Sequence, residues 1–172
     1  MNKFHVFLAS MAIAGSALAT DKTAGEHIDD SWIHTKVKSA LVGEGASTIN
    51  IEVHNGVVQL AGFVKSDLAR DAAVQEAGAV KGVKRISNKL VVESKSRTPG
   101  RALDDGVVAA RVKKRIAEDE RTSSIEINVE VRHGIVLLSG FVDSEMERDA
   151  ALVIARNVVG EDNVIDGMDI GA

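Results

Sequence analysis

Two stretches of the chain repeat each other, Gly56-Val-Val-Gln-Leu-Ala-Gly-Phe-Val64 and Gly134-Ile-Val-Leu-Leu-Ser-Gly-Phe-Val142. The segments around them also match, and the pairs are Ile49-Asn-Ile-Glu-Val53 with Ile127-Asn-Val-Glu-Val131 and Arg70-Asp-Ala-Ala73 with Arg148-Asp-Ala-Ala151. These blocks are offset by 78 residues, whereas Asp29-Asp30 and Asp104-Asp105 are offset by 75, so the second copy has three extra residues near 118–123. A period this long predicts two copies of a small domain rather than a solenoid.

Each copy predicts the same five elements. Alternating apolar residues predict a first strand, and Asn55-Gly56 predicts a hairpin turn after it. An apolar residue every four positions predicts a helix before that strand, and a second helix starts at Ser66 or Ser144, the latter with a capping box. The fold class is therefore α+β: two tandem α-β-β-α-β units, each a three-stranded mixed sheet with two helices packed on one face. The predicted ranges are helices 30–42 and 105–118, second strands that end at Val64 and Val142, and third strands 85–92 and 163–170.

The second strand of each copy is apolar on both faces near Phe63 and Phe141, which predicts that it is central or covered. Because a unit of about 70 residues without disulfides is only marginally stable, we expect the two copies to pack together or to stabilise each other. Phe63 and Phe141 occupy equivalent positions, which favours a structural role in the core or in the contact between the copies.

The first residues have the pattern of a targeting signal rather than of a folded segment. Residues 1–19 combine Lys3, an apolar stretch too short to span a membrane, and the cleavage pattern Ala17-Leu-Ala19. We expect a signal peptide cleaved after Ala19, with no lipid anchor because no Cys follows, and hence a periplasmic protein; an N-terminal amphipathic helix is the alternative. The other predicted boundaries are a first domain at 27–93, a linker with the only proline at 94–101, and a second domain at 102–171.

The composition excludes several classes of function. The 172 residues include no Cys, which excludes disulfides, thiol catalysis, zinc–thiolate sites and iron–sulfur clusters. A net charge of −4, only 3% aromatic residues and no Tyr argue against a nucleic-acid partner. No apolar run reaches the roughly 18 residues that a membrane span needs, so no transmembrane segment is expected in the exported chain.

No set of residues predicts catalysis, a metal site or a cofactor, and we expect a protein that is not an enzyme. The Asp pairs 29–30 and 104–105 fall at helix starts, where Asp caps free N–H groups. The histidines lack metal-ligand spacing and are interpreted as solvated surface residues: His27, His34, His54 and His133. The structural glycines are assigned to turns or strand ends rather than to a phosphate loop: Gly56, Gly62, Gly82, Gly134, Gly140 and Gly160.

The repeated unit resembles the BON domain. The resemblance rests in repeat 1 on the helix start Asp29–Lys38, the hairpin Val53–Gly62, the helix motif Ser66–Ala73 and the strand motif Gly82–Leu90. Repeat 2 matches up to Gly160 and departs at its last strand, where Val164-Ile-Asp-Gly-Met168 replaces Ile86-Ser-Asn-Lys-Leu90. Similarity to BON proteins with two such units implies a non-enzymatic periplasmic protein of osmotic and envelope stress, with phospholipid-surface binding and chaperone-like support of envelope proteins as activities.

Trp32 is the aromatic residue that neither the signal peptide nor the repeat accounts for, since repeat 2 has Val107 there. Trp at an apolar–polar boundary beside a Lys suits a membrane interface. Repeat 1 has equal numbers of acidic and basic residues, whereas residues 101–172 have fifteen acidic and nine basic residues. The candidate residues for binding an anionic phospholipid surface are Trp32, Lys36, Lys81, Lys84, Arg85 and Lys89.

Three alternatives stay open at this stage. Trp32 could instead staple its helix start to the core or to the other repeat, and the basic residues could simply protect an edge strand. The protein could act as a chaperone-like or adaptor protein that binds exported envelope proteins. It could also have a purely structural role and only crowd the periplasm.

Overall fold

The computed structural model describes residues 29–42, 48–93, 105–122 and 127–171. The predicted signal peptide and the predicted linker lie outside these ranges, as does His27. Repeat 1 consists of α1 (Asp30–Ala40), β1 (Ile49–His54), β2 (Val57–Val64), α2 (Asp67–Gly78) and β3 (Arg85–Val92). Repeat 2 consists of α3 (Asp105–Glu118), β4 (Asn128–Arg132), β5 (Ile135–Val142), α4 (Glu145–Val159), the short 3-10 helix η2 (Glu161–Asn163) and β6 (Val164–Ile170).

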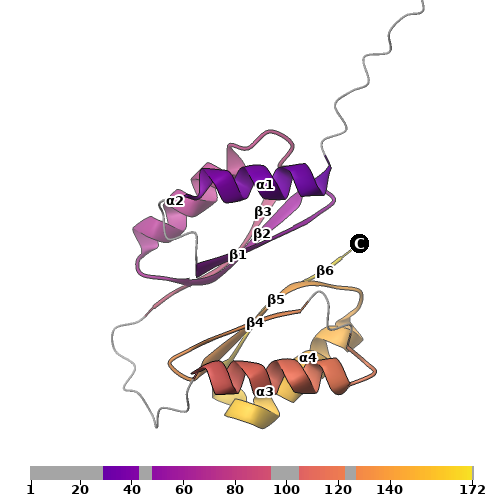
Figure 1. The fold of residues 1–172 in the computed structure, drawn as a ribbon. Helices are drawn as coiled ribbons and strands as arrows, with labels where there is room; N and C mark the ends of the chain where they lie inside the picture. Colours follow the sequence, from indigo (N-terminus) through magenta and orange to yellow (C-terminus); the bar gives the residue numbers. More distant parts are fainter. Residues whose placement is uncertain (1–28, 43–47, 94–104, 123–126, 172) are drawn as a thin grey trace, which may run out of the picture.

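Each repeat forms a three-stranded sheet with two helices on its outer face (Figure 1). In repeat 1 the order is β1-β2-β3, with β1 antiparallel and β3 parallel to the central β2. Repeat 2 has the same order and directions in β4-β5-β6. The α+β prediction, with two helices on one face of a mixed sheet, is confirmed.

The local signals place the element ends where the sequence predicted them. In the hairpin turns Asn55 (φ 52°) precedes Gly56 (φ 79°), and His133 (φ 53°) precedes Gly134 (φ 77°), the pair of positive φ values that a tight two-residue turn requires. The hydroxyls of Ser66 and Ser144 accept hydrogen bonds from helix N–H groups three residues later. All six structural glycines named from the sequence have positive φ.

The Asp pairs at the helix starts divide into two roles. The Asp29 carboxylate accepts a hydrogen bond from the N–H of Trp32 at 2.7 Å, as a helix cap does. The Asp30 carboxylate instead accepts from Asn55 N at 2.6 Å and from Gly56 N at 2.8 Å. Asp105 makes the same two contacts with the turn of the second hairpin, at 2.8 and 2.9 Å. The expectation that both residues of each pair cap a helix is therefore wrong for Asp30 and Asp105, which fasten the hairpin turn to the helix.

The three extra residues of repeat 2 lengthen its first helix. With the 75-residue offset, the end of α1 at Ala40 corresponds to Arg115, whereas α3 continues to Glu118. A turn that follows is closed by the Asp119 carboxylate, which pairs with the Arg121 guanidinium at 2.7 Å. The hydrogen bonds from Arg121 hold the pKa of Asp119 at about 2.

Each repeat has its own apolar core between its helices and its sheet. In repeat 1 the first helix contributes Ile33 and Val37, and the second contributes the small residues Ala73 and Ala77. In repeat 2 the matching core is larger, because Leu152 and Ile154 of α4 are also buried. Small residues on the second helix let it lie close to the sheet.

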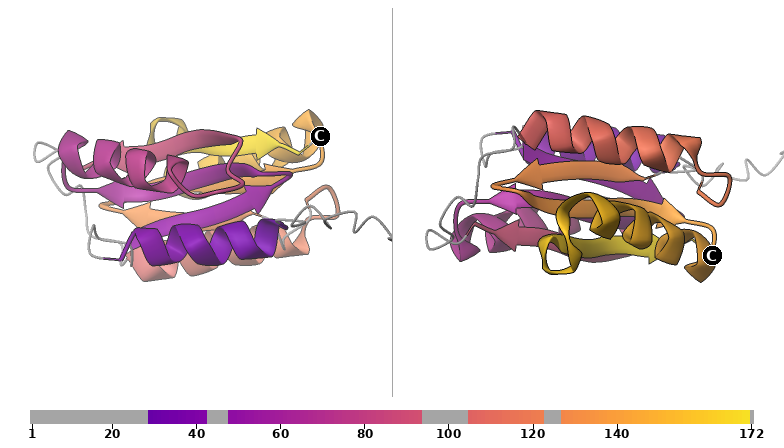
Figure 2. Two further views of the ribbon diagram at one scale, coloured as in Figure 1. Left: turned by 90° about the horizontal axis from the view of Figure 1, so that it is seen from above. Right: turned by 90° about the horizontal axis from the view of Figure 1, so that it is seen from below.

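The helix-free faces of the two sheets pack against each other, so the molecule has four layers in the order helices, sheet, sheet, helices (Figures 1 and 2). Their shared apolar cluster consists of Ala61, Phe63, Ile135 and Leu137, with Val91 and Ile165 against it. This contact covers the second face of β2 and β5. The expectation that the repeats pack together is met.

The central strands run in opposite directions across this contact. Gln59, near the start of β2, hydrogen-bonds to both backbone groups of Gly140, near the end of β5. Phe63, near the end of β2, lies in one cluster with Ile135 at the start of β5. The hairpin of repeat 1 therefore lies at the same end of the sandwich as the carboxyl end of β5.

Candidate functional site

Trp32 lies on the first turn of α1 with 38% of its surface exposed. It is therefore not fully buried, and part of its surface faces solvent. The Lys36 ammonium lies over its ring, 5.5 Å from the ring centroid, which is cation–π geometry. A partly exposed indole with an ammonium group at its face matches the pattern of an amphipathic interface residue.

The contacts of the first hairpin bring further basic residues to the same end of repeat 1. Asp30 joins the start of α1 to the hairpin turn. The Lys84 ammonium donates to the carbonyl of Asn55 at 3.0 Å, and the backbone N–H of Lys84 donates to the carbonyl of Gly56 at 2.9 Å. Arg85 follows and pairs with Val57 at the start of β2. Lys81 precedes Lys84 by three residues in the loop that leads into β3. We call the exposed residues Trp32, Lys36, Lys81, Lys84 and Arg85 the Trp32 end.

Lys89 does not belong to the Trp32 end. Its ammonium forms an ion pair with the Asp169 carboxylate of repeat 2 at 3.0 Å, and both side chains are half-buried. Asp169 also accepts hydrogen bonds from Gln59 at 2.8 Å and from Ser87. The structure thus separates Lys89 from the cluster that the sequence proposed and uses it to join the repeats.

The Asp169 carboxylate is held in its ionised form. Burial raises its pKa, but the hydrogen bonds from Ser87, Gln59 and Lys89 together outweigh that effect and hold the pKa below its ordinary value. We call this group of four residues the Asp169 cluster. Its sequence signal is weak, because the partners lie 80 to 110 positions apart.

The histidines that the structure describes belong to no group of metal-ligand side chains. His54 is half-buried and its ring packs on Phe141 of repeat 2, with the centroids 5.3 Å apart. The interpretation of His54 as a solvated surface residue is therefore wrong. Within residues 29–42, 48–93, 105–122 and 127–171, no group of three or more His, Asp or Glu side chains could hold a metal ion.

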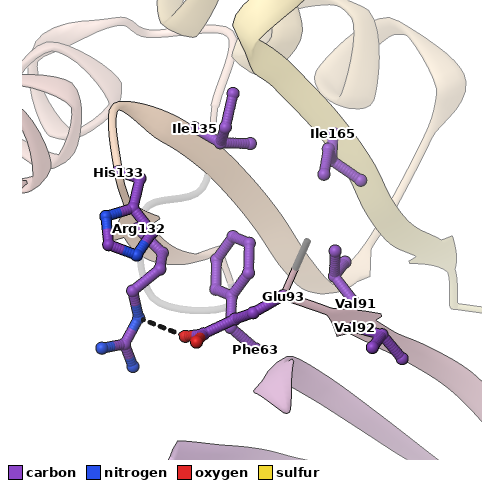
Figure 3. A pocket seen from close by; sticks show the side chains of 8 residues that line it. All are labelled: Phe63, Val91, Val92, Glu93, Arg132, His133, Ile135 and Ile165. Carbon is purple, nitrogen blue, oxygen red and sulfur yellow. Dashed lines mark ion pairs between the residues drawn. The ribbon is translucent and has the colours of Figure 1, made fainter. Parts of the chain in front are cut away.

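A cavity of about 230 Å³ lies between the repeats at the other end of their contact (Figure 3). We call it the inter-repeat cavity. Its apolar walls include Phe63, Val91, Ile135 and Ile165, and Arg132 and Glu93 lie at its rim. Arg132 Nε lies 3.2 Å from Glu93 Oε1, the ion pair drawn in Figure 3. No local sequence pattern marks this cavity, because its lining comes from both repeats.

The BON domain signature matches residues 29–94 and again residues 104–172. The chain belongs to the BON domain family. Osmotically inducible protein Y of Escherichia coli (strain K12) is 33% identical to it, over 92% of this chain and 90% of that protein. The outer membrane lipoprotein DolP of Haemophilus influenzae is 28% identical, over 90% of this chain and 81% of that protein.

Among solved structures, the chain is similar to the C-terminal domain of CdsD, a structural protein of the type III secretion system of Chlamydia trachomatis. The identity is 17% and the TM-score 0.32, with 83% of this chain and 66% of that chain covered, so the BON assignment rests on the sequence matches instead. No helix in the part of the chain that the structure describes is both long and apolar enough to cross a membrane.

Proposed function

We propose that this BON protein is a periplasmic envelope-stress protein, of the osmotic-stress type, that binds anionic phospholipid surfaces peripherally through the Trp32 end of repeat 1. Similarity to osmotically inducible protein Y and to an outer membrane lipoprotein supports the envelope location. The predicted signal peptide at residues 1–19 supports export.

The observation that carries the lipid proposal is the exposed Trp32 ring with Lys36 at its face and further basic residues beside it. The indole enters the headgroup layer, and the ammonium and guanidinium groups face lipid phosphates. Each such charge near an anionic leaflet contributes about 1 kcal/mol, so a few of them give weak, salt-dependent attachment.

Vesicle co-sedimentation tests this proposal. The protein should pellet with phosphatidylglycerol vesicles at low salt, and not with phosphatidylcholine vesicles. Trp32→Ala should lower the bound fraction severalfold, whereas Val107→Ala, at the equivalent position of repeat 2, should leave it unchanged. Binding that survives Trp32→Ala, or that is equal for both lipids, would contradict the proposal.

The charge contribution has a matched test in the two repeats. The double variant Lys81→Gln with Lys84→Gln should weaken binding to phosphatidylglycerol by about an order of magnitude or more. Lys113→Gln with Lys114→Gln removes the same charge from α3 and serves as the control. Equal losses from both pairs would show that net charge alone, and not the Trp32 end, drives attachment.

The second candidate function is chaperone-like binding of exported envelope proteins. Leu68 is 81% exposed and Met146 is 74% exposed, and they occupy equivalent positions in the first turns of α2 and α4. The inner apolar faces of β2 and β5 are covered by the contact between the repeats and are not available to a client. If Leu68→Ser with Met146→Ser leaves suppression of outer-membrane-protein aggregation unchanged, these two residues are not the client surface.

A further inference from the structure

At the opposite end of the contact, the positions equivalent to the cavity lining hold side chains that contact each other. There His54, the equivalent of Arg132, packs on Phe141, the equivalent of Phe63. Ser87 and Asp169, the equivalents of Ile165 and Val91, are joined by a hydrogen bond. One end of the contact is thus fastened by polar groups, and the other is left with apolar walls around an open volume.

Five of the eight residues that line the cavity are apolar, and the other three, Glu93, Arg132 and His133, carry polar groups. The buried Nε–H of Arg132 has no hydrogen-bond partner among the described residues, because the Glu93 carboxylate at 3.2 Å is not aligned to accept it. An unpaired buried donor is costly, so an acceptor supplied at this point would be stabilised.

The charge of Arg132 is already balanced. Glu93 neutralises it, and Glu130 lies 3.9 Å from its guanidinium on the far side. A third carboxylate at this rim would face two others. The acceptor that fits is therefore an uncharged oxygen, such as an ester carbonyl or a hydroxyl.

We propose that the inter-repeat cavity binds one hydrocarbon chain with an uncharged oxygen head, the chemistry of a monoacylglycerol. The cavity exceeds the roughly 150 Å³ at which an apolar protein cavity takes up benzene, and it is smaller than the roughly 300 Å³ at which pockets for larger ligands begin. It therefore has room for part of one chain, and not for the two chains of a phospholipid.

A peptide segment fits the walls less well than a hydrocarbon chain. Its N–H and C=O groups would need partners along the whole segment, and the side chains of Phe63, Val91, Ile135 and Ile165 offer none. A methylene chain needs none, and burying it gains about 0.8 kcal/mol per methylene group. This site is separate from the Trp32 end, so either proposal can fail while the other stands.

Methyl NMR of the whole protein, titrated with 1-decanoylglycerol below its micelle concentration, tests the assignment. The shifts should be confined to Val91, Ile135 and Ile165, with the methyls of Val57, the equivalent of Ile135, unchanged. Decanoate, which has a carboxylate head on a chain of the same length, should bind about fivefold or more weakly. Absent shifts, shifts scattered over the surface, equally tight decanoate, or an apolar tetrapeptide that binds the same methyls more tightly would each overturn the proposal.

Filling the cavity provides the second readout. Ile165→Phe should weaken 1-decanoylglycerol binding at least tenfold, whereas Ile170→Phe, near the other end of β6, should not. Arg132→Met should weaken it about fivefold because Met has no N–H donor, and His54→Met, at the equivalent position, should leave it unchanged. Retained shifts of the helix-side core methyls identify folded variants. Unchanged affinity in a folded Ile165→Phe protein would contradict the site.

Discussion

The two repeats have one fold and two different sets of surface residues. At their contact, repeat 1 presents Gln59, Ser87 and Lys89 where repeat 2 presents Leu137, Ile165 and Gly167. The three polar groups of repeat 1 converge on one carboxylate of repeat 2, while Leu137 and Ile165 lie in the shared apolar cluster with Val91, and Ile165 also lines the cavity. The duplication supplied a nearly symmetric contact. Substitution gave one end the Asp169 cluster and left the other with a cavity of mostly apolar lining beside the Arg132–Glu93 ion pair.

The same divergence affects the outer ends of the repeats. Trp32, Lys84 and Arg85 in repeat 1 correspond to Val107, Asp162 and Asn163 in repeat 2. The shared elements, including the Asp30 and Asp105 contacts with the hairpin turns, hold both sets in the same framework. The fold alone therefore does not distinguish the repeats, and function is argued from these positions.

The largest expected difference concerns the two equivalent Phe residues. Replacing a buried Phe by Ala costs about 3–5 kcal/mol of unfolding free energy. Phe141 is covered by His54 and should lie at the upper end, whereas Phe63 already borders the cavity and should lie at the lower end. Urea unfolding of Phe141→Ala and Phe63→Ala measures both. A larger loss for Phe63→Ala would contradict this difference between the two ends of the contact.

The next effect comes from the Asp169 cluster. Asp169→Ala removes the acceptor of three side chains and leaves a half-buried Lys89 without its ion-pair partner, so we expect a loss of about 2 kcal/mol. Asp162→Ala, an exposed carboxylate of the same repeat, should stay within about 0.5 kcal/mol of the unchanged protein. Urea unfolding followed by circular dichroism compares the two. Equal stability of both variants would show that the Asp169 cluster does not stabilise the fold.

A smaller effect appears as pH dependence. The pKa of Asp169 is lower in the folded chain than the roughly 3.9 of an unfolded Asp, so its contribution is complete above that value and is lost as the pH falls through the folded pKa. Asp169→Asn should flatten the unfolding free energy in this acid range.

Glu130, at the other end of the contact, should behave in the opposite way. Burial raises its pKa, ahead of the lowering by Arg132 and by the N–H of Phe63. A raised carboxyl pKa disfavours folding once the group is ionised, so its unfavourable effect should develop as the pH rises through the range between its unfolded and its folded pKa. Glu130→Gln should therefore raise the unfolding free energy at pH values above this range. Urea unfolding of Asp169→Asn and Glu130→Gln over the same acid pH range measures both effects. A change of the unfolding free energy in the same direction for both variants would contradict the assignment.

The elements were predictable from the sequence because their signals are local. Alternating Ile and Val residues, Asn55-Gly56 and the Ser66 and Ser144 caps each act within a few residues, and the structure places the element ends there. The repeat itself provided two independent samples of the same pattern. The basic residues near the first hairpin were likewise identified because they lie close together in the sequence.

The contact between the repeats could not be predicted at the level of residues. Lys89 alternates with apolar residues on its strand in the way that an edge-protecting Lys does, and nothing local indicates that Asp169 faces it. The cavity depends on the antiparallel match of β2 with β5, which no single segment encodes. A comparison of equivalent positions gives the available signal, since Asp169 stands where repeat 1 has Val91.

The central claim is that the Trp32 end contacts the lipid surface, and fluorescence tests it directly because the chain has one Trp. On adding phosphatidylglycerol vesicles at low salt, the emission of Trp32 should shift to shorter wavelength, and high salt should reverse the shift. The double variant Trp32→Val with Val107→Trp moves the fluorophore to the equivalent turn of repeat 2 and should show no shift. A shift in the exchanged variant equal to that of the unchanged protein, or no shift in either, would contradict the account.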